Sequence, residues 1–156
     1  MRKTTIICAL GLAVIALAAL NVAAGDHAYV GAEKCKMCHK VQFNSWLETT
    51  HAKATEAAQA STEPAFELKC LGCHATNSDE RLSGVQCEAC HGAGADFKKM
   101  SIMKDRDTAV TNGLVLATQA TCDGCHKDDG HSKVVVLADN LENKTAIHEF
   151  KNPPGE

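Results

Sequence analysis

The sequence CEACHG, residues 87–92, holds two cysteines three positions apart and a histidine directly after the second cysteine. Cys-x-x-Cys pairs are common in metal and redox sites, but an adjoining histidine is not part of most of them. The same five-residue pattern occurs four times, as CKMCH at 35–39, CLGCH at 70–74, CEACH at 87–91 and CDGCH at 122–126. The intervals between the copies differ, so the copies are not the units of a solenoid repeat.

The four copies use every cysteine of the chain except Cys8. Their members are Cys35, Cys38, Cys70, Cys73, Cys87, Cys90, Cys122 and Cys125, with the histidines His39, His74, His91 and His126. CxxCH is the attachment signature of c-type haem, in which two thiols bond one porphyrin and the following histidine binds its iron. Cysteines three apart lie on one face of a helical turn, as this bonding requires. We therefore predict four covalently bound c-type haems.

Three other uses of paired cysteines compete with this interpretation. They are structural zinc sites with four cysteine ligands, a thioredoxin-like redox pair and disulfides of an exported protein. Zinc would leave four adjacent histidines without a role, and no βαβ pattern surrounds the motifs. Four copies that together use all the remaining cysteines favour haem attachment.

The first 24 residues have the pattern of a secretory signal peptide. Arg2 and Lys3 precede an apolar run at 6–20, and small residues follow at 22–24. The run of about fifteen residues is shorter than the ~20 of a membrane-spanning helix, so a retained anchor is less favoured. We predict cleavage after residue 24, which removes Cys8 and leaves a tetrahaem domain at 25–156. Since haem is attached outside the cytoplasm, a periplasmic or otherwise exported protein is expected, with no membrane span after cleavage.

The composition of the remaining chain favours a haem-filled interior. With one tryptophan and one tyrosine, so short a chain has few large side chains for a core. We predict a mainly α protein with little sheet, whose core is formed by four closely packed haems. Without Arg2 and Lys3 the 16 basic residues become 14 against 19 acidic ones, a net charge of −5. No long basic run is present, so nucleic acid is not an expected partner.

Three segments are predicted to be helical, at 41–60, 95–110 and, more weakly, 136–150. The first has no glycine or proline and is rich in alanine, glutamate and lysine, which favour helices. The valines at 134–136 form the only strand-like run, and residues 75–86 are predicted to be a loop.

Histidines outside the motifs are candidate second ligands of the haem irons; they are His27, His51, His131 and His148. His51 lies twelve residues after His39, about 18 Å along a continuous helix, so it must serve another iron or none. His148 could fold back onto the fourth haem. His131 is only five residues beyond His126 and would need near-full extension to reach the far face of the same haem, so a surface position is favoured.

Met100 and Met103 are the other candidate ligands. A thioether is a known axial ligand of haem iron, and it raises the reduction potential relative to a second imidazole. The two residues are three apart and share a face of the predicted helix, although methionine more often serves in packing. His27, beside the predicted new N-terminus, is a further candidate for which a surface position is favoured.

Three stretches resemble one family over nearly the whole predicted mature chain. YVGAEKCKMCH at 29–39, SWLETTHAKA at 45–54 and GVQCEACHGAGADF at 84–97 are similar to the tetrahaem cytochrome c family typified by cytochrome c five-five-four of ammonia oxidisers. The resemblance implies a mainly helical fold with closely stacked haem pairs.

The resemblance also implies ligands for three of the haems. It places His51 opposite His91 on the third haem and His148 opposite His126 on the fourth. The second haem, here on His74, is typically five-coordinate in the family.

The chain departs from the family at the first haem. There the family uses a histidine that follows the third motif, but residues 92–121 contain none. Met103 or Met100 stands at about that place, and we favour Met103 as the ligand opposite His39.

The leading functional prediction is a periplasmic electron carrier that works between a redox enzyme and another cytochrome or a membrane quinone-linked complex. Six-coordinate haems have no free position for a substrate. The alternative is a small reductase of nitric oxide or hydroxylamine at a five-coordinate haem on His74. Lys69, Asp79 and Glu80 are the charged residues nearby in sequence, and they make no convincing acid–base set. Enzyme activity is therefore less favoured, as is a subunit of a larger multihaem assembly.

Overall fold

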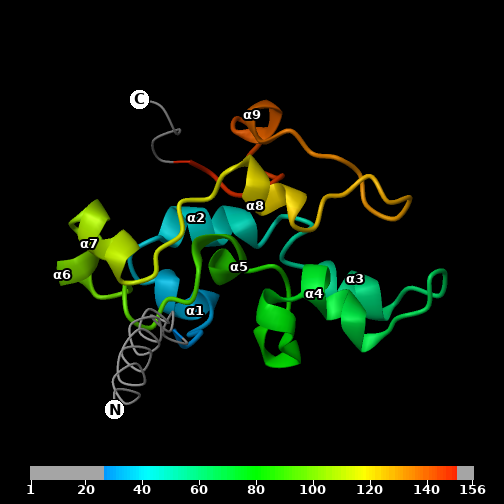
Figure 1. The fold of residues 1–156 in the computed structure, drawn as a ribbon, viewed down its shortest axis with the longest axis horizontal. Helices are drawn as coiled ribbons and strands as arrows, with labels where there is room; N and C mark the ends of the chain where they lie inside the picture. Colours follow the sequence, from blue (N-terminus) through cyan, green and yellow to red (C-terminus); the bar gives the residue numbers. More distant parts are fainter. Residues whose placement is uncertain (1–26, 151–156) are drawn as a thin grey trace, which may run out of the picture.

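The fold is a chain of short helices joined by turns, as Figure 1 shows. The computed structural model describes residues 27–150, so the predicted signal peptide at 1–24 lies outside the described residues. The described α-helices are α1 Ala32–Cys35, α2 Lys40–Trp46, α3 Ala54–Gln59, α4 Leu71–His74, α5 Cys87–His91, α6 Met100–Met103, α7 Arg106–Thr111, α8 Gln119–Asp123 and α9 Leu137–Asn140. The 3-10 turns are η1 Leu68–Cys70, η2 Thr76–Ser78 and η3 Glu80–Leu82. Between residues 27 and 150 no helix has the length and apolar character needed to cross a membrane.

The prediction of a mainly α fold with little sheet is confirmed. Over the described residues, strand-like pairing is limited to isolated bridges. The valines at 134–136 do not form a strand, because side chains take the place of a neighbouring strand. Gln119 donates its amide to the Val135 carbonyl at 2.7 Å and accepts from the Leu137 N–H at 2.8 Å.

The single helix predicted over 41–60 is wrong, because residues 47–53 form a turn between α2 and α3. The hydroxyl of buried Thr49 donates to the Trp46 carbonyl at 2.7 Å and accepts from the Ala52 N–H at 3.2 Å. Such bonds from a side chain to nearby backbone compete with helical hydrogen bonds. As a result His51 lies in a turn and not on a helix.

The other two predicted helices are also shorter in the structure. Residues 95–110 hold α6 and most of α7, which are separated where Asp105 caps α7 by accepting from the Thr108 N–H at 2.7 Å. Residues 136–150 hold only α9 and turns. The predicted loop at 75–86 contains η2 and η3.

The turn that holds His51 packs against the segment before the third motif. The Val85 N–H donates to the His51 carbonyl at 2.8 Å, and the Trp46 indole donates to the Val85 carbonyl at 2.8 Å. Gly84 has a φ of +78°, and a Cβ there would lie 2.5 Å from the Ala52 carbonyl oxygen. This close approach requires glycine.

The apolar core of the described residues is small. It consists of Ala32, Phe43, Ala58, Leu71, Ala75, Ala93, Phe97 and Ala109. Five of these eight side chains are single methyl groups, which bury little apolar area. Figure 1 shows α5 in the middle of the molecule, with α1 and α4 to either side and α8 above it. Each of these four helices includes all or part of one CxxCH motif, so the motifs gather where a larger core would otherwise be.

Candidate haem sites

Each CxxCH motif coils as a helical turn, the local shape that haem attachment needs. In the first and fourth motifs the histidine N–H donates to the carbonyl of the first cysteine, at 2.9 Å for His39 and 2.8 Å for His126. The last four residues of the second motif form α4, and the whole third motif forms α5. This turn brings the two thiols and the imidazole to one side of the backbone.

Three motif histidines are oriented by a hydrogen bond from Nδ1. A carbonyl oxygen can only accept, so Nδ1 carries the hydrogen and the Nε2 lone pair is left available. Iron-ligating histidines are held by the same kind of outer hydrogen bond. The pairs are His74 with the Ala54 carbonyl, His91 with the Val115 carbonyl and His126 with the Lys133 carbonyl, each at 3.2 Å.

Burial keeps two of the candidate ligands in the neutral form. It lowers the pKa of His91, with the neighbouring His148 and His39 acting in the same direction and the Val115 carbonyl opposing them. Burial and the adjacent His126 likewise lower the pKa of His51. The neutral imidazole is the form that binds a metal, so these environments suit axial ligands.

Three pairs of imidazole rings face each other, with similar distances between the ring centres. The ring centres are 6.0 Å apart for His51 and His126, 5.9 Å for His74 and His131 and 6.4 Å for His91 and His148. A histidine nitrogen binds a metal at about 2 Å and its ring centre lies roughly 1 Å further, so two opposed ligands have centres about 6 Å apart. Rotation about the nitrogen–metal axis leaves this distance unchanged, so differing ring angles also fit. Each pair joins one motif histidine to one histidine outside the motifs.

The rings that face each other in the structure differ from the ligand pairs that the family resemblance implied. His51 was expected opposite His91 and His148 opposite His126, but His51 faces His126 and His148 faces His91. Two local features account for this. The turn at 47–53 directs His51 toward the fourth motif, and the Glu149 N–H donates to the Ser45 hydroxyl at 2.6 Å, which holds the C-terminal segment against α2.

His131 has a neighbour that sequence reasoning did not identify. It is exposed, as expected, but its ring faces His74, where the resemblance implied an open position. Its distance of five residues from His126 held no hint of this, because its partner belongs to a motif 57 residues earlier in the chain.

The ligand opposite His39 stays a prediction. Among the described residues no aromatic ring faces His39. Met103 on α6 is half-buried, while Met100 on the same helix is 61% exposed. His27, the other candidate, binds the Asp96 carboxylate through Nδ1 at 2.6 Å.

Thiols of different motifs lie in contact. The Cys87 thiol hydrogen-bonds that of Cys35, which raises the pKa of Cys35 and lowers that of Cys87. Burial, followed by a hydrogen bond with Cys73, raises the pKa of Cys125 to about 12. Haem attachment would consume these thiols, so the contacts matter for the distances that they imply. No disulfide joins any of the eight cysteines between residues 27 and 150.

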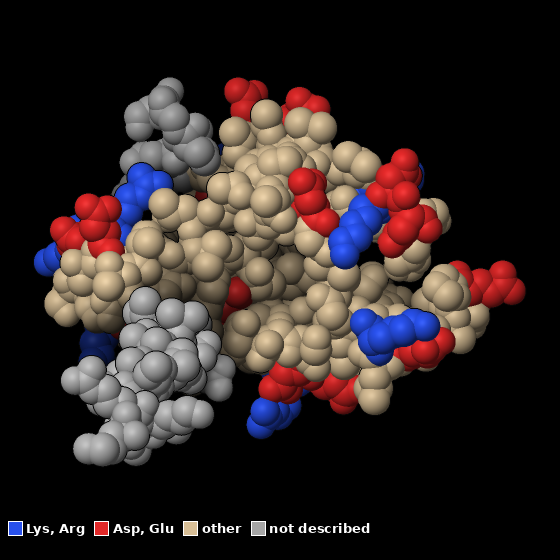
Figure 2. Space-filling model, viewed as in Figure 1, with Lys and Arg blue, Asp and Glu red and all other residues tan. Residues whose placement is uncertain are grey.

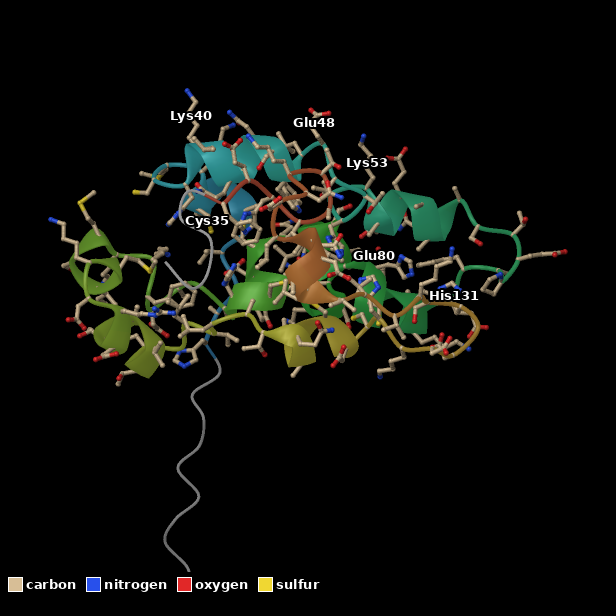
Figure 3. All side chains as sticks on the ribbon, turned by 90° about the horizontal axis from the view of Figure 1, so that it is seen from above. Cys35, Lys40, Glu48, Lys53, Glu80 and His131 are labelled. Carbon is tan, nitrogen blue, oxygen red and sulfur yellow. The ribbon has the colours of Figure 1, made fainter. Side chains whose placement is uncertain are left out.

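The third and fourth motifs also lie near each other, since α5 and α8 are neighbours in Figure 1, and the Cys125 thiol of the fourth motif donates to the Gly72 carbonyl of the second at 3.9 Å. Burial and the nearby Cys122 raise the pKa of Cys90. The motifs therefore follow one another in space in the order first, third, fourth and second. Figure 3 agrees, since Cys35 of the first motif and His131, which faces the second, lie well apart along the molecule.

Glu88, inside the third motif, is a structural residue that sequence reasoning missed. Its side chain is only 3% exposed, and its carboxylate accepts from the N–H groups of Val30 at 2.9 Å, Gly31 at 2.7 Å and Gly94 at 2.6 Å. It thereby ties the segment before the first motif to the third motif. Nothing in the CxxCH pattern distinguishes this variable position.

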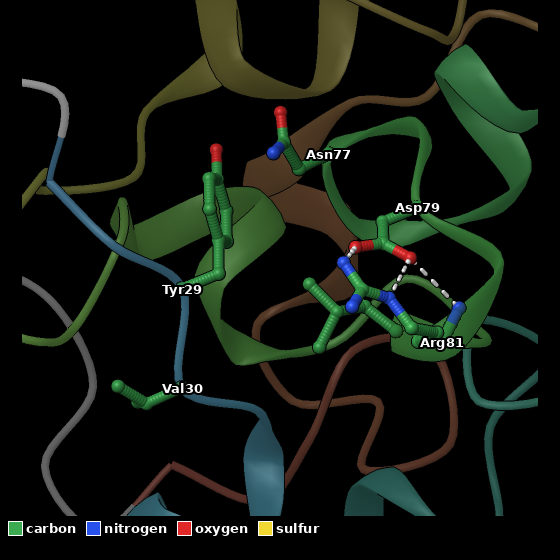
Figure 4. Close-up of a pocket in the computed structure, with 6 residues that line it drawn as sticks. Tyr29, Val30, Asn77, Asp79 and Arg81 are labelled. Carbon is green, nitrogen blue, oxygen red and sulfur yellow. Dashed lines mark hydrogen bonds and ion pairs between the residues drawn. The ribbon is translucent and has the colours of Figure 1, made fainter.

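A hollow of about 400 Å³ near η2 and η3 holds no motif residue; Figure 4 shows its lining, which is Tyr29, Val30, Asn77, Asp79, Arg81 and Leu82. Arg81 binds both carboxylate oxygens of Asp79, at 3.0 and 2.7 Å. These bonds hold the pKa of Asp79 below its usual range.

Four haem-attachment motifs on a mainly helical scaffold define the chain as a multihaem c-type cytochrome. Residues 34–92 match the family described as cytochrome c554 and c-prime. Over 121 residues the chain is 34% identical to cytochrome c-554 of Nitrosomonas europaea, a match that covers 60% of this chain and 52% of the relative. The chain thus spans about half the length of that relative. Residues 34–92, which hold the first three motifs, are thus similar to the cytochrome c554 family, in agreement with the resemblance seen in the sequence.

A solved structure shows the same fold. It is the reduced state of cytochrome c554 from Nitrosomonas europaea, with a TM-score of 0.57 and 24% identity, and the match covers 79% of this chain and 86% of that chain. The family is one of tetrahaem c-type cytochromes with covalently bound haems. All eight cysteines for four haems are present, so the predicted cofactor is confirmed.

Proposed function

We propose that the chain carries electrons between redox proteins outside the cytoplasm. The observation that carries the proposal is the close series of motifs in space, from the first through the third and fourth to the second. Bound at motifs this close together, c-type haems supply irons that gain and lose single electrons and exchange them with their neighbours. A series of this kind suits transfer through the molecule.

Side chains in and near the four motifs would bind each haem iron from both faces of the porphyrin. The motif histidines His39, His74, His91 and His126 would be the first axial ligands. His51 would serve opposite His126 and His148 opposite His91, as their ring distances support. Positions occupied on both sides leave no room for a substrate, which favours a carrier over a reductase.

For the first haem we propose Met103 as the second ligand, with Met100 and His27 as alternatives. Met103 is supported because its side chain is more buried than that of Met100 on the same helix. Met100, at 61% exposure, fits less well, and His27, whose Nδ1 is bonded to Asp96, stays an alternative.

The proposed partners are other cytochromes or a membrane quinone-linked complex, met in the periplasm. The predicted signal peptide supports export, and a net charge of −5 after its removal supports docking on a basic patch. Figure 2 shows acidic and basic side chains around the edge of one face, with few charges in its middle. A face of this kind provides an uncharged contact area inside a charged rim.

The test is a holoprotein matured in a host that attaches c-type haem. Haem content should be four per chain, and a redox titration should show that every haem is reduced and reoxidised. Rapid mixing with a reduced cationic cytochrome should then oxidise that partner. A holoprotein that holds four haems but exchanges electrons with neither a cationic nor an anionic cytochrome would contradict the carrier role.

A further inference from the structure

His131 and His74 form a ring pair like the other two. Their centres are 5.9 Å apart, against 6.0 and 6.4 Å for the pairs at the fourth and third motifs. Aromatic rings in plain contact also fall in this range, so the distance alone does not distinguish packing from opposed ligands. The surroundings of the pair do.

Hydrogen bonds within the loop at 127–133 fix the position of His131. The Asp129 carboxylate accepts from the N–H groups of His131 at 3.0 Å and Ser132 at 2.9 Å, and Gly130 has a φ of +83°. The end of the loop is held by the bond from His126 Nδ1 to the Lys133 carbonyl. The His131 ring thus points away from His126 of the fourth motif and toward His74 of the second motif.

The two rings border a hollow that contains the chemistry of a haem site. Its volume is about 140 Å³, and its lining includes the Cys70 thiol, the His74 and His131 rings and the apolar side chains of Ala57, Ala58 and Phe66. His74 is oriented through Nδ1 by the Ala54 carbonyl, so its Nε2 is free for iron. An attachment thiol, a first ligand, an opposed imidazole and an apolar wall therefore meet at one place.

We propose that His131 is the second axial ligand of the haem attached at Cys70 and Cys73, opposite His74. The inference rests on the proposed function, since it assumes a haem at this motif within the electron-carrying series. It departs from the five-coordinate second haem that the family resemblance implied. With both axial positions filled, this haem is low-spin and closed to small ligands, and the reductase alternative loses its site.

The test compares wild-type holoprotein with His131→Ala by electron paramagnetic resonance of the ferric state and by carbon monoxide titration of the ferrous state. His131→Ala should add a high-spin signal equal to one haem of the four and should bind one more carbon monoxide per chain than the wild type. His131→Met should stay low-spin with a raised potential at one haem, since a thioether replaces an imidazole. Any high-spin signal or carbon monoxide binding from the first haem is the same in wild type and His131→Ala. The difference between the two proteins therefore reports on the second haem.

Asp128→Ala is the matched control, because Asp128 shares the exposed loop but its side chain makes none of the hydrogen bonds found in the described structure. It should leave both readings unchanged. Equal high-spin content and carbon monoxide uptake in wild type and His131→Ala would overturn the ligation while leaving electron transfer intact. The proposed function fails separately, if a four-haem protein with the expected His131→Ala change exchanges no electrons with either class of cytochrome.

Discussion

Glu88 is a residue of a haem-attachment motif that also joins two segments of the backbone. It is a buried carboxylate whose charge is balanced by three backbone N–H groups from two segments. Hydrogen bonds to a charged acceptor are stronger than neutral ones, and buried donors that lose their acceptor are costly. Glu88 therefore holds the first and third motifs together from inside.

We predict that Glu88→Ala lowers the free energy of unfolding of the holoprotein by about 3 kcal/mol, because three N–H groups, one buried and two partly buried, lose their acceptor. Glu88→Gln should cost less, since its amide oxygen still accepts. Denaturant unfolding measures both. Glu33→Ala is the control, because Glu33 is exposed and pairs only with Lys36 at 3.5 Å, so a change below about 1 kcal/mol is expected. Equal losses at Glu88 and Glu33 would contradict a buried structural role.

A second prediction at this scale concerns the ligand of the first haem. Met103→Ala should remove the absorption band of a thioether bound to ferric iron and lower the potential of one haem. Met100→Ala should leave the band in place, since the Met100 side chain is largely exposed. Loss of the band in Met100→Ala alone would assign the ligand to Met100, and an unchanged spectrum in both variants would point to His27.

Among the elements, the turn at 47–53 has the largest effect on the site. It separates α2 from α3 and puts His51 within reach of the fourth motif. Its position depends on the segment 84–85 that packs against it. Gly84 allows that packing, because any side chain there would meet the Ala52 carbonyl.

Gly84→Ala should destabilise the holoprotein by about 1 to 3 kcal/mol, because its Cβ would lie 2.5 Å from a backbone oxygen and its φ is +78°. The displaced turn should also weaken ligation by His51, which would appear as extra high-spin signal. Thermal unfolding and electron paramagnetic resonance measure the two effects. Gly72→Ala is the control, because a Cβ there has no neighbour within 4 Å. A loss in Gly72→Ala as large as in Gly84→Ala would argue against the steric cause.

The N-terminus of α7 provides a pH-dependent contact. Hydrogen bonds from Thr108 lower the pKa of Asp105. A carboxyl whose folded pKa lies below its unfolded value of about 3.9 stabilises the fold above that pH, and the contribution is lost as pH falls through the folded value. The melting temperature of wild type should thus exceed that of Asp105→Ala near neutral pH, and the two should converge in acid. A difference independent of pH would contradict ionisation as the cause.

At the scale of the whole molecule, the order of the motifs in space differs from their order in sequence. The first and second motifs lie at opposite ends of the series, and the third and fourth lie between them. Electrons could therefore enter near one outer motif and leave near the other, on separate parts of the surface.

The net charge of −5 that cleavage of the predicted signal peptide would leave leads to a prediction about partners. The rate of electron exchange with a cationic cytochrome should fall as ionic strength rises from about 10 mM to 150 mM, because salt screens the attraction that steers docking. Stopped-flow mixing over this range measures the effect. An anionic cytochrome is the control, and its rate should rise or stay constant. A cationic partner whose rate is insensitive to salt would argue against electrostatic docking.

Much of the site could be predicted from sequence, but only its local part. The attachment cysteines and the motif histidines lie within five residues, so one helical turn decides their arrangement. The helices at 41–60 and 95–110 were predicted too long, because composition does not reveal hydrogen bonds such as those of Thr49 and Asp105 that interrupt them. His131 was assigned to the surface because only its distance from His126 could be judged.

The sequence by itself determined the class of protein, the number of haems and their points of attachment, since these depend on covalent spacing within each motif. The tertiary structure alone decided which imidazole faces which motif and how the motifs follow one another. The partners lie 57 residues apart for His74 and His131 and 75 for His51 and His126. Such pairings depend on where helices break and how turns pack, which no local pattern contains.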